Sequence, residues 1–164
     1  MKKMETIKIE IKVVDKGVMQ AELYPEIAPK TVENFVNLIS QKFFDGLIFH
    51  RVIAGFMIQG GGYDAAFRHH EASSIVGEFA SNGIANSLKH TPGVLSMART
   101  NMPNSASSQF FIMHQAAPHL DGAYAAFGQV IEGMEVVDLI ANVPTDLRDA
   151  PLSPVVIESI RVID

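Results

Sequence analysis

Short apolar segments separated by turn residues make up most of this chain and leave room for only two helices. The clearest separators are Gly60-Gly61-Gly62, Thr91-Pro92-Gly93 and Asp121-Gly122, because glycine, proline and aspartate favour turns. Many short strands with few helices favour a closed antiparallel β-barrel. Residues 63–92 are polar and irregular, and a stretch that long is either functional or wrongly assigned. After an initial hairpin, the expected strands are Leu47–Ile53, Phe56–Gln59, Val94–Ala98, Gln109–Met113, Ala125–Ile131 and Val155–Ile163.

That hairpin is expected at the start of the chain. Apolar residues alternate with charged ones from Ile7 to Val13, which is typical of a strand with one buried and one solvent-exposed face. Asp15-Lys16-Gly17 predicts a turn, and Val18 to Tyr24 predicts the returning strand.

Two amphipathic helices are expected, one early and one late. Pro29 suits the first turn of a helix, where its missing N–H costs nothing, and an apolar stripe follows at Val32, Phe35, Val36 and Ile39. The second helix is expected after Gly133 and before Pro144, with Val136, Val137, Ile140 and Ala141 facing inward. Two helices are too few for alternating strand–helix units. We therefore expect a mainly β, barrel-like domain with one helix over each open end.

Composition and charge limit the class of protein. The chain has 164 residues, 48% hydrophobic and 19% charged, so we expect one globular domain over residues 1–164. The net charge is -5, with 13 basic and 18 acidic side chains, so no nucleic-acid partner is expected. Neither a membrane span nor a signal peptide is expected, because no long apolar run occurs and none follows Met1–Glu5. The absence of cysteine excludes disulfides and thiolate chemistry and is consistent with a cytoplasmic protein.

Arg51 stands out because it interrupts an apolar strand, Phe49 to Ile53. It is either a solvated arginine on an edge strand or a guanidinium held over a groove, where its fixed donors suit a carbonyl or amide. Met57 and Gln59 lie two residues apart and share one face of the next strand. Gln59 offers both a donor and an acceptor, as a peptide-binding surface requires.

Two further segments mix apolar and polar residues in the same way. In the strand Gln109–Met113, Phe111 shares one face with Gln109 and Met113, while Phe110 and Ile112 share the other. One face is then the core, and the other is either a binding groove or a surface covered by a loop or helix. His119 and Tyr124 flank the turn at Asp121-Gly122, where a loop histidine is usually just solvated.

Other chemistries find little support. His69-His70-Glu71 resembles a metal cluster, but neighbouring residues in a strand point to opposite faces and no second ligand pair has suitable spacing. Gly60-Gly61-Gly62 lacks the spacing of a phosphate-binding loop. No serine nucleophile motif and no carboxylate pair are found. No metal and no cofactor are therefore expected, and the remaining groove suits binding, or catalysis by binding.

Taken together, three collinear segments make the chain resemble the cyclophilins over about Ile7 to Val162. The first is Phe49-His50-Arg51 followed by Gly55-Phe56-Met57-Ile58-Gln59-Gly60-Gly61. The second is Leu95-Ser96-Met97-Ala98 followed by Ser108-Gln109-Phe110-Phe111-Ile112. The third is Leu120-Asp121-Gly122 with Phe127-Gly128-Gln129-Val130 and Gly133-Met134.

This resemblance implies an eight-stranded antiparallel barrel, a helix over each end, and peptidyl-prolyl cis/trans isomerase activity in a groove on the outer surface. Arg51 matches the catalytic arginine, and Gln59 matches the glutamine that binds the substrate backbone. The proline pocket matches Phe56, Met57, Phe111 and Leu120. Ala98, Arg99 and Gln109 match the wall that holds the residue before proline and its neighbours. At Arg99 the family uses main-chain groups, so its side chain has no assigned role. His50 matches a position beside the site.

Three departures from the family pattern bear on ligand preference. His119 stands where many cyclophilins have tryptophan, and Tyr124 stands where many have histidine. Residues 99–103 form a stretch one residue longer than usual, without the glycine common before Pro103. We therefore expect cyclosporin-type cyclic peptides to bind only weakly.

The expected partners are proline-containing peptides and unfolded or folding proteins, bound by a monomer that assists protein folding. Two other functions stay open. A binding module would hold Pro-containing segments with little turnover, and a barrel that carries a small apolar ligand would have a hollow interior.

Overall fold

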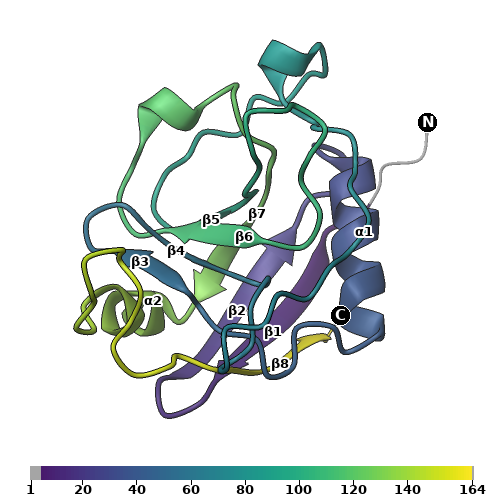
Figure 1. Ribbon diagram of the computed structural model, residues 1–164. Coiled ribbons are helices and arrows are strands. Elements are labelled where there is room, and N and C mark those ends of the chain that lie inside the picture. Colours follow the sequence, from purple (N-terminus) through teal and green to yellow (C-terminus); the bar gives the residue numbers. More distant parts are fainter. Residues whose placement is uncertain (1–4, 164) are drawn as a thin grey trace.

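The computed structural model describes residues 5–163, in which one eight-stranded antiparallel sheet curls around the core (Figure 1). The expectation that the chain has no signal peptide depends mainly on its first residues, and residues 1–4 lie outside this range. The strand order is β3-β4-β6-β5-β7-β2-β1-β8. The strands are β1 (Ile7–Val13), β2 (Gly17–Leu23), β3 (Arg51–Ile53), β4 (Met57–Gly60), β5 (Val94–Met97), β6 (Phe110–Met113), β7 (Ala126–Glu132) and β8 (Ile157–Val162).

The predicted hairpin is confirmed. β1 and β2 pair from Ile7 opposite Leu23 to Val13 opposite Gly17, so that alternate residues of both strands point inward. Ile9 and Ile11 are fully buried, whereas Lys8 and Lys12 face solvent. The alternation of the sequence thus fixes which face of this hairpin is the core.

The ends of the sheet meet without a continuous strand ladder. β3 and β8 are the outermost strands in the order, and the segments in front of them are joined by one bridge between Ile48 and Val156. Two hydrogen bonds extend this junction, from Phe49 N–H to the Val155 carbonyl (3.0 Å) and from Ile157 N–H to the Leu47 carbonyl (2.8 Å). The expected eight strands and two helices are present, but the closure is looser than a fully closed barrel.

Two helices, α1 (Pro29–Ser40) and α2 (Met134–Ala141), lie on opposite sides of the sheet (Figure 1). Pro29 occupies the first turn of α1, as predicted, and the buried face of the helix includes Val32, Phe35 and Ile39. Val36, predicted on the same stripe, is only partly buried. Gly133 precedes α2 with φ +96°, and a Cβ there would lie 2.5 Å from the Val18 carbonyl oxygen, so this turn requires glycine. Among residues 5–163, no helix has the length and apolarity needed to cross a membrane.

The interior is filled by aromatic side chains. Phe35 contacts Phe44, Phe110 and Phe127, with ring centroids 4.9, 5.2 and 5.0 Å away. All four rings are essentially inaccessible to solvent. This packing argues against a hollow barrel that carries a ligand inside.

The long region 63–92 is irregular apart from one short 3-10 helix, Ala80–Asn82. Buried polar groups hold it in place. The Glu78 carboxylate accepts hydrogen bonds from the backbone N–H (2.6 Å) and hydroxyl (2.7 Å) of Thr31 in α1. The Asn86 amide donates to the carbonyls of Glu78 and Ala126, both at 2.9 Å. The region is therefore ordered by side-chain hydrogen bonds rather than by strands or long helices.

Candidate functional site

The site is built on one row of residues that crosses neighbouring strands. Arg51 in β3 lies opposite Gln59 in β4, which lies opposite Phe111 in β6, which lies opposite Ser96 in β5. Paired residues of a sheet point to the same face. The adjacent row, Val52, Ile58, Ile112 and Leu95, faces the core instead. Both expected faces of the Gln109–Met113 strand are thus seen, and the outer face carries Arg51.

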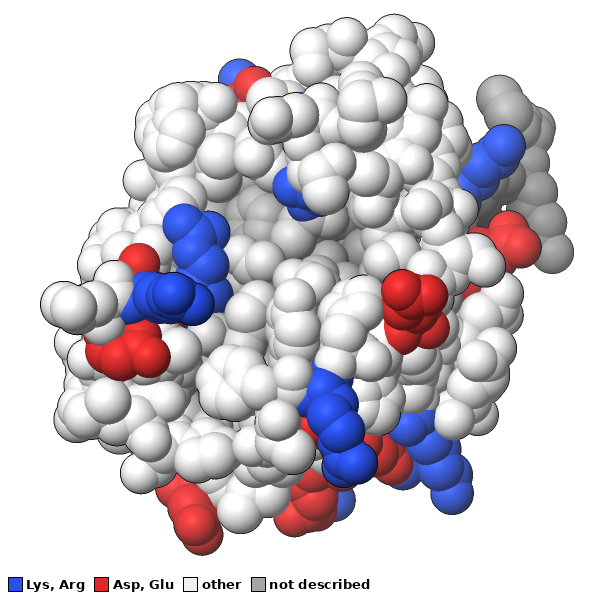
Figure 2. Space-filling view, in the orientation of Figure 1, with Lys and Arg blue, Asp and Glu red and all other residues white. Residues whose placement is uncertain are grey.

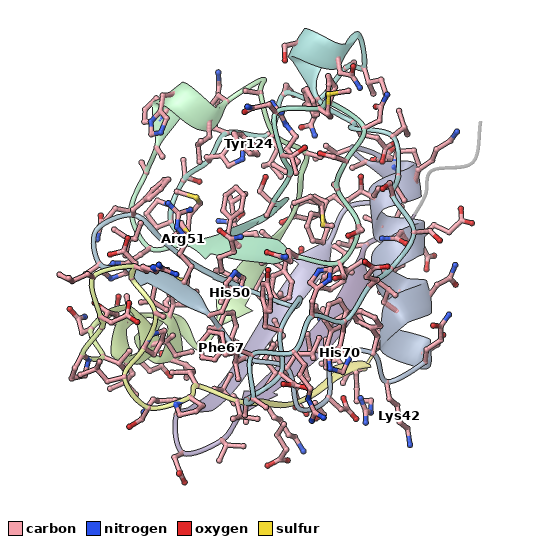
Figure 3. All side chains as sticks on the ribbon, in the orientation of Figure 1. Lys42, His50, Arg51, Phe67, His70 and Tyr124 are labelled. Carbon is pink, nitrogen blue, oxygen red and sulfur yellow. The ribbon has the colours of Figure 1, made fainter. Side chains whose placement is uncertain are left out.

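A pocket of about 140 Å³ opens on this outer face. The space-filling view shows a hollow with mostly uncharged walls and basic groups at its margin (Figure 2). Arg51 and Tyr124 reach the pocket from separate segments, β3 and the loop before β7 (Figure 3). The lining residues are Arg51, Phe56, Met57, Gln59, Ala98, Arg99, Phe111, Leu120 and Tyr124, all named as candidates from the sequence.

Arg51 is exposed, and its guanidinium is only loosely held. Nη1 donates to Gln59 Oε1 over 3.4 Å, at the limit of a hydrogen bond. Gln59 in turn donates from Nε2 to Gln109 Oε1 at 3.1 Å. Both sequence interpretations of Arg51 therefore hold in part: it is a solvated residue of an edge strand, and it overhangs a pocket with free donors.

The floor of the pocket is apolar and rigid. Met57, Phe111 and Leu120 are 1%, 5% and 7% exposed, and they belong to a hydrophobic cluster separate from the main core. The Phe111 ring stacks on the His90 ring (centroids 6.0 Å apart) and meets Tyr124 edge-on (5.8 Å). An apolar ring of about the size of proline could be buried here at the edge of the Arg51 guanidinium.

A second, adjoining hollow of about 160 Å³ lies on the other side of Gln59. Gln109 lines it together with Ala98 and Arg99, beside the hydroxyl-bearing residues Thr100, Ser105 and Ser107. Gly62 makes room for this arrangement, since a Cβ there would lie 2.6 Å from the Gln109 side chain. The glycine run at 60–62 thus serves close packing.

Three predicted site residues do not line this pocket: Gln109 lines the adjoining hollow, and His50 and His119 line neither. His50 is mostly buried beneath Arg51 and packs against Tyr63, with ring centroids 4.8 Å apart. Burial, with a smaller effect from the positive charge of Arg51, lowers the pKa of His50 from 6.5 to about 4, so the ring is neutral near pH 7. His119 is exposed on the short 3-10 helix Pro118–Leu120, 5.9 Å from the Phe56 ring, so it flanks the rim.

Sequence reasoning missed the buried group behind the floor. His90 Nδ1 lies 3.0 Å from Asp121 Oδ1, and its Nε2 lies 2.8 Å from Ser96 Oγ. Burial lowers the pKa of His90, so we assign a neutral ring that donates to Asp121 and accepts from Ser96. This Asp–His–Ser chain resembles a nucleophilic triad, but Ser96 is fully buried and out of reach of a substrate. In the sequence, Asp121 indicated only a turn, because its partner lies 31 residues away.

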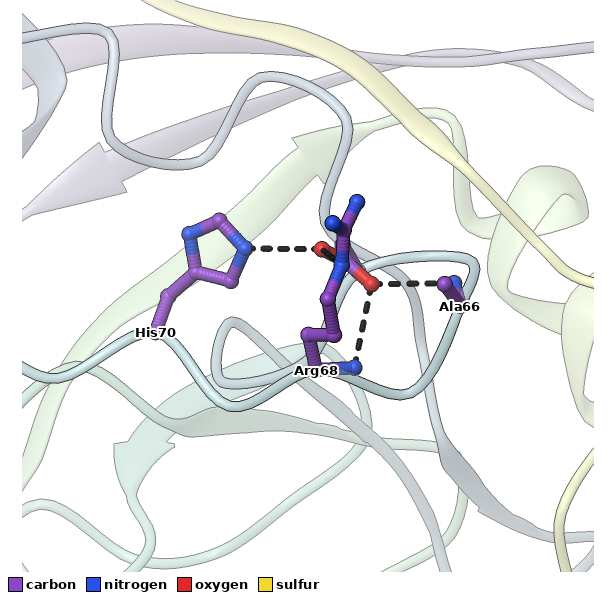
Figure 4. A network of polar contacts seen from close by, with 4 residues as sticks. Ala66, Arg68 and His70 are labelled. Atoms are coloured by element: carbon purple, nitrogen blue, oxygen red, sulfur yellow. Dashed lines mark hydrogen bonds and ion pairs between the residues drawn. The ribbon is translucent and has the colours of Figure 1, made fainter.

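The histidine pair at 69–70 reaches two different acids. His70 Nε2 lies 2.9 Å from Asp64 Oδ2, and His69 Nδ1 lies 3.9 Å from Glu71 Oε1. Asp64 also accepts hydrogen bonds from the backbone N–H groups of Ala66 and Arg68 and from Arg68 Nε (Figure 4). These bonds hold the pKa of the Asp64 carboxyl well below its usual range. The pair thus helps to order a loop.

The chemistry available at the pocket is that of a donor beside an apolar floor. Among the nine lining residues there is no carboxylate, imidazole or nucleophilic hydroxyl other than the Tyr124 phenol. A guanidinium offers hydrogen-bond donors and a positive charge but no acceptor. The site therefore suits the electrostatic stabilisation of a bound amide rather than acid–base or covalent catalysis.

Comparisons with known proteins agree on one family. Residues 6–162 match the model of the cyclophilin type peptidyl-prolyl cis-trans isomerases. A peptidyl-prolyl cis-trans isomerase of Acinetobacter baylyi is 44% identical over 155 residues, covering 89% of this chain and 80% of the relative. Peptidyl-prolyl cis-trans isomerase B of Escherichia coli is 39% identical over 158 residues, covering 89% and 94%.

Solved structures show the same similarity in three dimensions. A cyclophilin of Cryptosporidium parvum superimposes with a TM-score of 0.84 at 30% identity, covering 98% of this chain and 99% of that one. The same protein solved in the presence of the dipeptide Ala-Pro gives a TM-score of 0.81, also at 30% identity, covering 96% and 99%. The fold, the motif order and these matches show that the chain belongs to the cyclophilin-type peptidyl-prolyl cis-trans isomerase family.

Proposed function

We propose that this isomerase turns X–Pro bonds in the Arg51 pocket, with Arg51 as the catalytic residue. The observation that carries this proposal is the pairing of an exposed guanidinium with an apolar pocket in one cross-strand row. A proline ring in the pocket would place its own nitrogen near the donors of Arg51. Arg99 is the other lining side chain with charged donors, but each of its three nitrogens donates a hydrogen bond within the protein, whereas Arg51 has a single long one.

The reaction needs a donor and no proton transfer. Rotation about the X–Pro bond breaks the amide resonance, which otherwise keeps the C–N bond planar. In the twisted transition state the prolyl nitrogen becomes pyramidal and gains a lone pair. A donor from Arg51 to that lone pair stabilises the twisted form more than either planar isomer, which is catalysis by differential binding. The arginine keeps its charge throughout.

The other lining residues would hold the chain still on either side of the rotating bond. Phe56, Met57, Phe111 and Leu120 would enclose the proline ring. The backbone at Ala98 and Arg99 would bind the segment before proline, with Gln59 and Gln109 as amide partners.

Proline-containing peptides are the general substrate class of the family, and we propose unfolded and folding proteins in the cytoplasm as the physiological partners. We further propose that the chain acts as a monomer, without nucleic-acid or membrane partners. Its mixed surface with a net charge of -5 supports the absence of a nucleic-acid partner. Cyclosporin-type peptides are expected to bind weakly, because His119 offers less apolar surface than tryptophan.

A prolyl-isomerisation assay on short Ala-Pro peptides tests the proposal against the alternative of a binding module. We expect catalysed exchange between the cis and trans peptides at substoichiometric enzyme, unchanged after treatment with a metal chelator. Peptide binding without accelerated exchange would favour the binding module. Loss of exchange on chelation, restored by added metal, would contradict the assigned chemistry.

A further inference from the structure

The Arg99 side chain has an unusually complete set of partners. Its Nε and Nη2 both donate to the Ala123 carbonyl, at 3.0 and 2.6 Å, and Nη1 donates to the Thr100 carbonyl at 3.0 Å. Its Cζ atom also lies 4.6 Å from the centroid of the Phe79 ring and 4.7 Å from that of Tyr124. Distances below about 6 Å are those of cation–π contacts. The guanidinium thus contacts two separate segments, around residues 79 and 123–124, besides the carbonyl of its own neighbour Thr100.

These partners differ in burial. Phe79 is 2% exposed and belongs to the main core, so it is a fixed base. Ala123 and Tyr124 belong to the loop between the 3-10 helix Pro118–Leu120 and β7, and Tyr124 is only partly buried. Arg99 therefore connects a wall of the pocket to the core across the gap between them.

The Tyr124 ring forms part of the pocket surface, because it lines the pocket and packs edge-on against Phe111 at 5.8 Å. Its orientation sets the width of the pocket on the side facing Arg51. The ring also contacts the Arg99 guanidinium, whose Cζ lies 4.7 Å from its centroid. Without that cation, Tyr124 would gain rotamers that turn it toward solvent.

We propose that Arg99 is a positioning residue for isomerisation: its side chain fastens Tyr124 and the Ala123 backbone to Phe79 and so keeps the proline pocket at the width of its substrate. The proposal rests on the assignment of the Arg51 pocket as the site of isomerisation. Each of the three guanidinium nitrogens of Arg99 already donates one hydrogen bond within the protein, so we assign its effect on the substrate to Tyr124. Its backbone remains free for the substrate, so the two roles are compatible.

The expected kinetic signature is a loss of binding rather than of chemistry. Arg99→Ala leaves Arg51 untouched, so kcat should stay within about twofold, while KM rises about tenfold. Arg99→Lys keeps the charge but loses the planar fork and its stacking, so it should recover only part of the loss. Arg68→Ala is the matched control, because Arg68 is an exposed arginine that pairs with Asp64 away from the pocket, and it should leave both constants unchanged.

A double-mutant cycle tests whether Arg99 acts through Tyr124. In a Tyr124→Ala background, Arg99→Ala should raise KM little further, because the ring it positions is already absent. Effects that simply add would overturn the proposal, as would a normal KM in folded Arg99→Ala. Arg51→Ala, assayed in parallel, separates the two hypotheses. Normal turnover there would refute the proposed function, whereas additive effects with an inactive Arg51→Ala would refute only the role of Arg99.

NMR of the arginine Nε–H groups gives a readout that does not depend on activity. The Arg99 Nε–H should be observable and protected, because it donates to Ala123, and the two rings should shift its frequency upfield. Tyr124→Ala should move this signal while the Arg68 signal stays in place. An Arg99 signal at the frequency of a solvated arginine would show that the guanidinium is not held between the rings, and the proposal would be wrong.

Discussion

Two arginines line the same pocket, and they differ in how their donors are used. Among residues 5–163, the guanidinium of Arg51 has one protein partner, Gln59, at a long 3.4 Å. That of Arg99 donates three hydrogen bonds and lies against two aromatic rings. A guanidinium can stabilise a substrate only with donors that the protein leaves free. The contrast therefore supports the proposed roles of Arg51 in transition-state binding and of Arg99 in the shape of the pocket, although both arginines line one hollow.

The largest effect is expected from Arg51→Ala. The side chain is exposed and has one weak contact, so the fold and stability should be nearly unchanged. Turnover should fall by about two to three orders of magnitude, equivalent to about 3–4 kcal/mol of lost transition-state stabilisation, with a smaller change in KM. Circular dichroism and an isomerisation assay on the same sample measure both. Near-normal turnover in the folded variant would remove the distinction between the two arginines.

The next effect concerns a residue that flanks the rim outside the pocket lining. His119 packs beside Phe56 but does not line the pocket. Replacing it with tryptophan adds apolar surface and an N–H donor, so cyclosporin inhibition should tighten by about 1–2 kcal/mol. Turnover of small Pro peptides should change little, because it depends on the pocket and on Arg51.

An inhibition titration of both proteins at one pH measures this change. Equal inhibition constants would show that His119 does not face the ligand, and that inhibitor affinity is determined inside the pocket after all.

A smaller effect is expected from Gln59→Leu, which tests whether Arg51 or Gln59 is the main donor. Gln59 accepts from Arg51 and donates to Gln109, so it is the one side chain that connects the free arginine to the adjoining hollow. Leucine preserves the volume and removes both bonds, which should lower kcat/KM about fivefold, equivalent to about 1 kcal/mol. Gln41→Leu, at an exposed position after α1, is the control and should change nothing. A loss as large as that of Arg51→Ala would mean that Gln59, not Arg51, is the main donor.

Sequence reasoning succeeded where a pattern is local. The alternation from Ile7 to Val13, the proline at the start of α1 and the opposite faces of β6 all depend on neighbours within a few residues, and all are confirmed. The candidate pocket residues came from motif order, and nine of them meet in one hollow. Three of them, Arg51, Gln59 and Phe111, lie in the row across the strands, and the rest come from neighbouring positions and loops.

Contacts between distant segments could not be predicted in the same way. The Arg99 side chain is the clearest case, because its partners Phe79 and Tyr124 lie 20 or more residues away in irregular loops, where no periodicity reports which side chains meet. His90 and Asp121 are another such pair. The resemblance to the family placed His50 beside the site, whereas its packing against Tyr63 could not be read from the sequence.

The smallest expected effect is a change in the titration of His50. Burial is the larger cause of its low pKa, about 4 against an ordinary 6.5, and the nearby charge of Arg51 is the second. If no carboxylate neutralises Arg51, removing its charge should change the titration of His50. Arg51→Ala should therefore raise the pKa of His50 but leave it below 6.5. Arg99→Ala should leave it unchanged, because Arg99 is not among the groups that shift it.

The sign of the linked stability effect follows from that low pKa. The unfolded chain binds the proton more readily than the folded one, so the contribution of His50 to stability is complete above pH 6.5 and declines as the pH falls toward 4. Because Arg51→Ala raises the pKa of His50 in the folded protein, the pH range over which stability declines should end at a pH higher than 4. The pKa is measured by NMR titration of the imidazole, assigned with His50→Gln, and the stability by urea unfolding across the same pH range. A His50 pKa that does not move in Arg51→Ala would show that the charge of Arg51 is already neutralised or screened, and the contrast with Arg99 would lose its electrostatic basis.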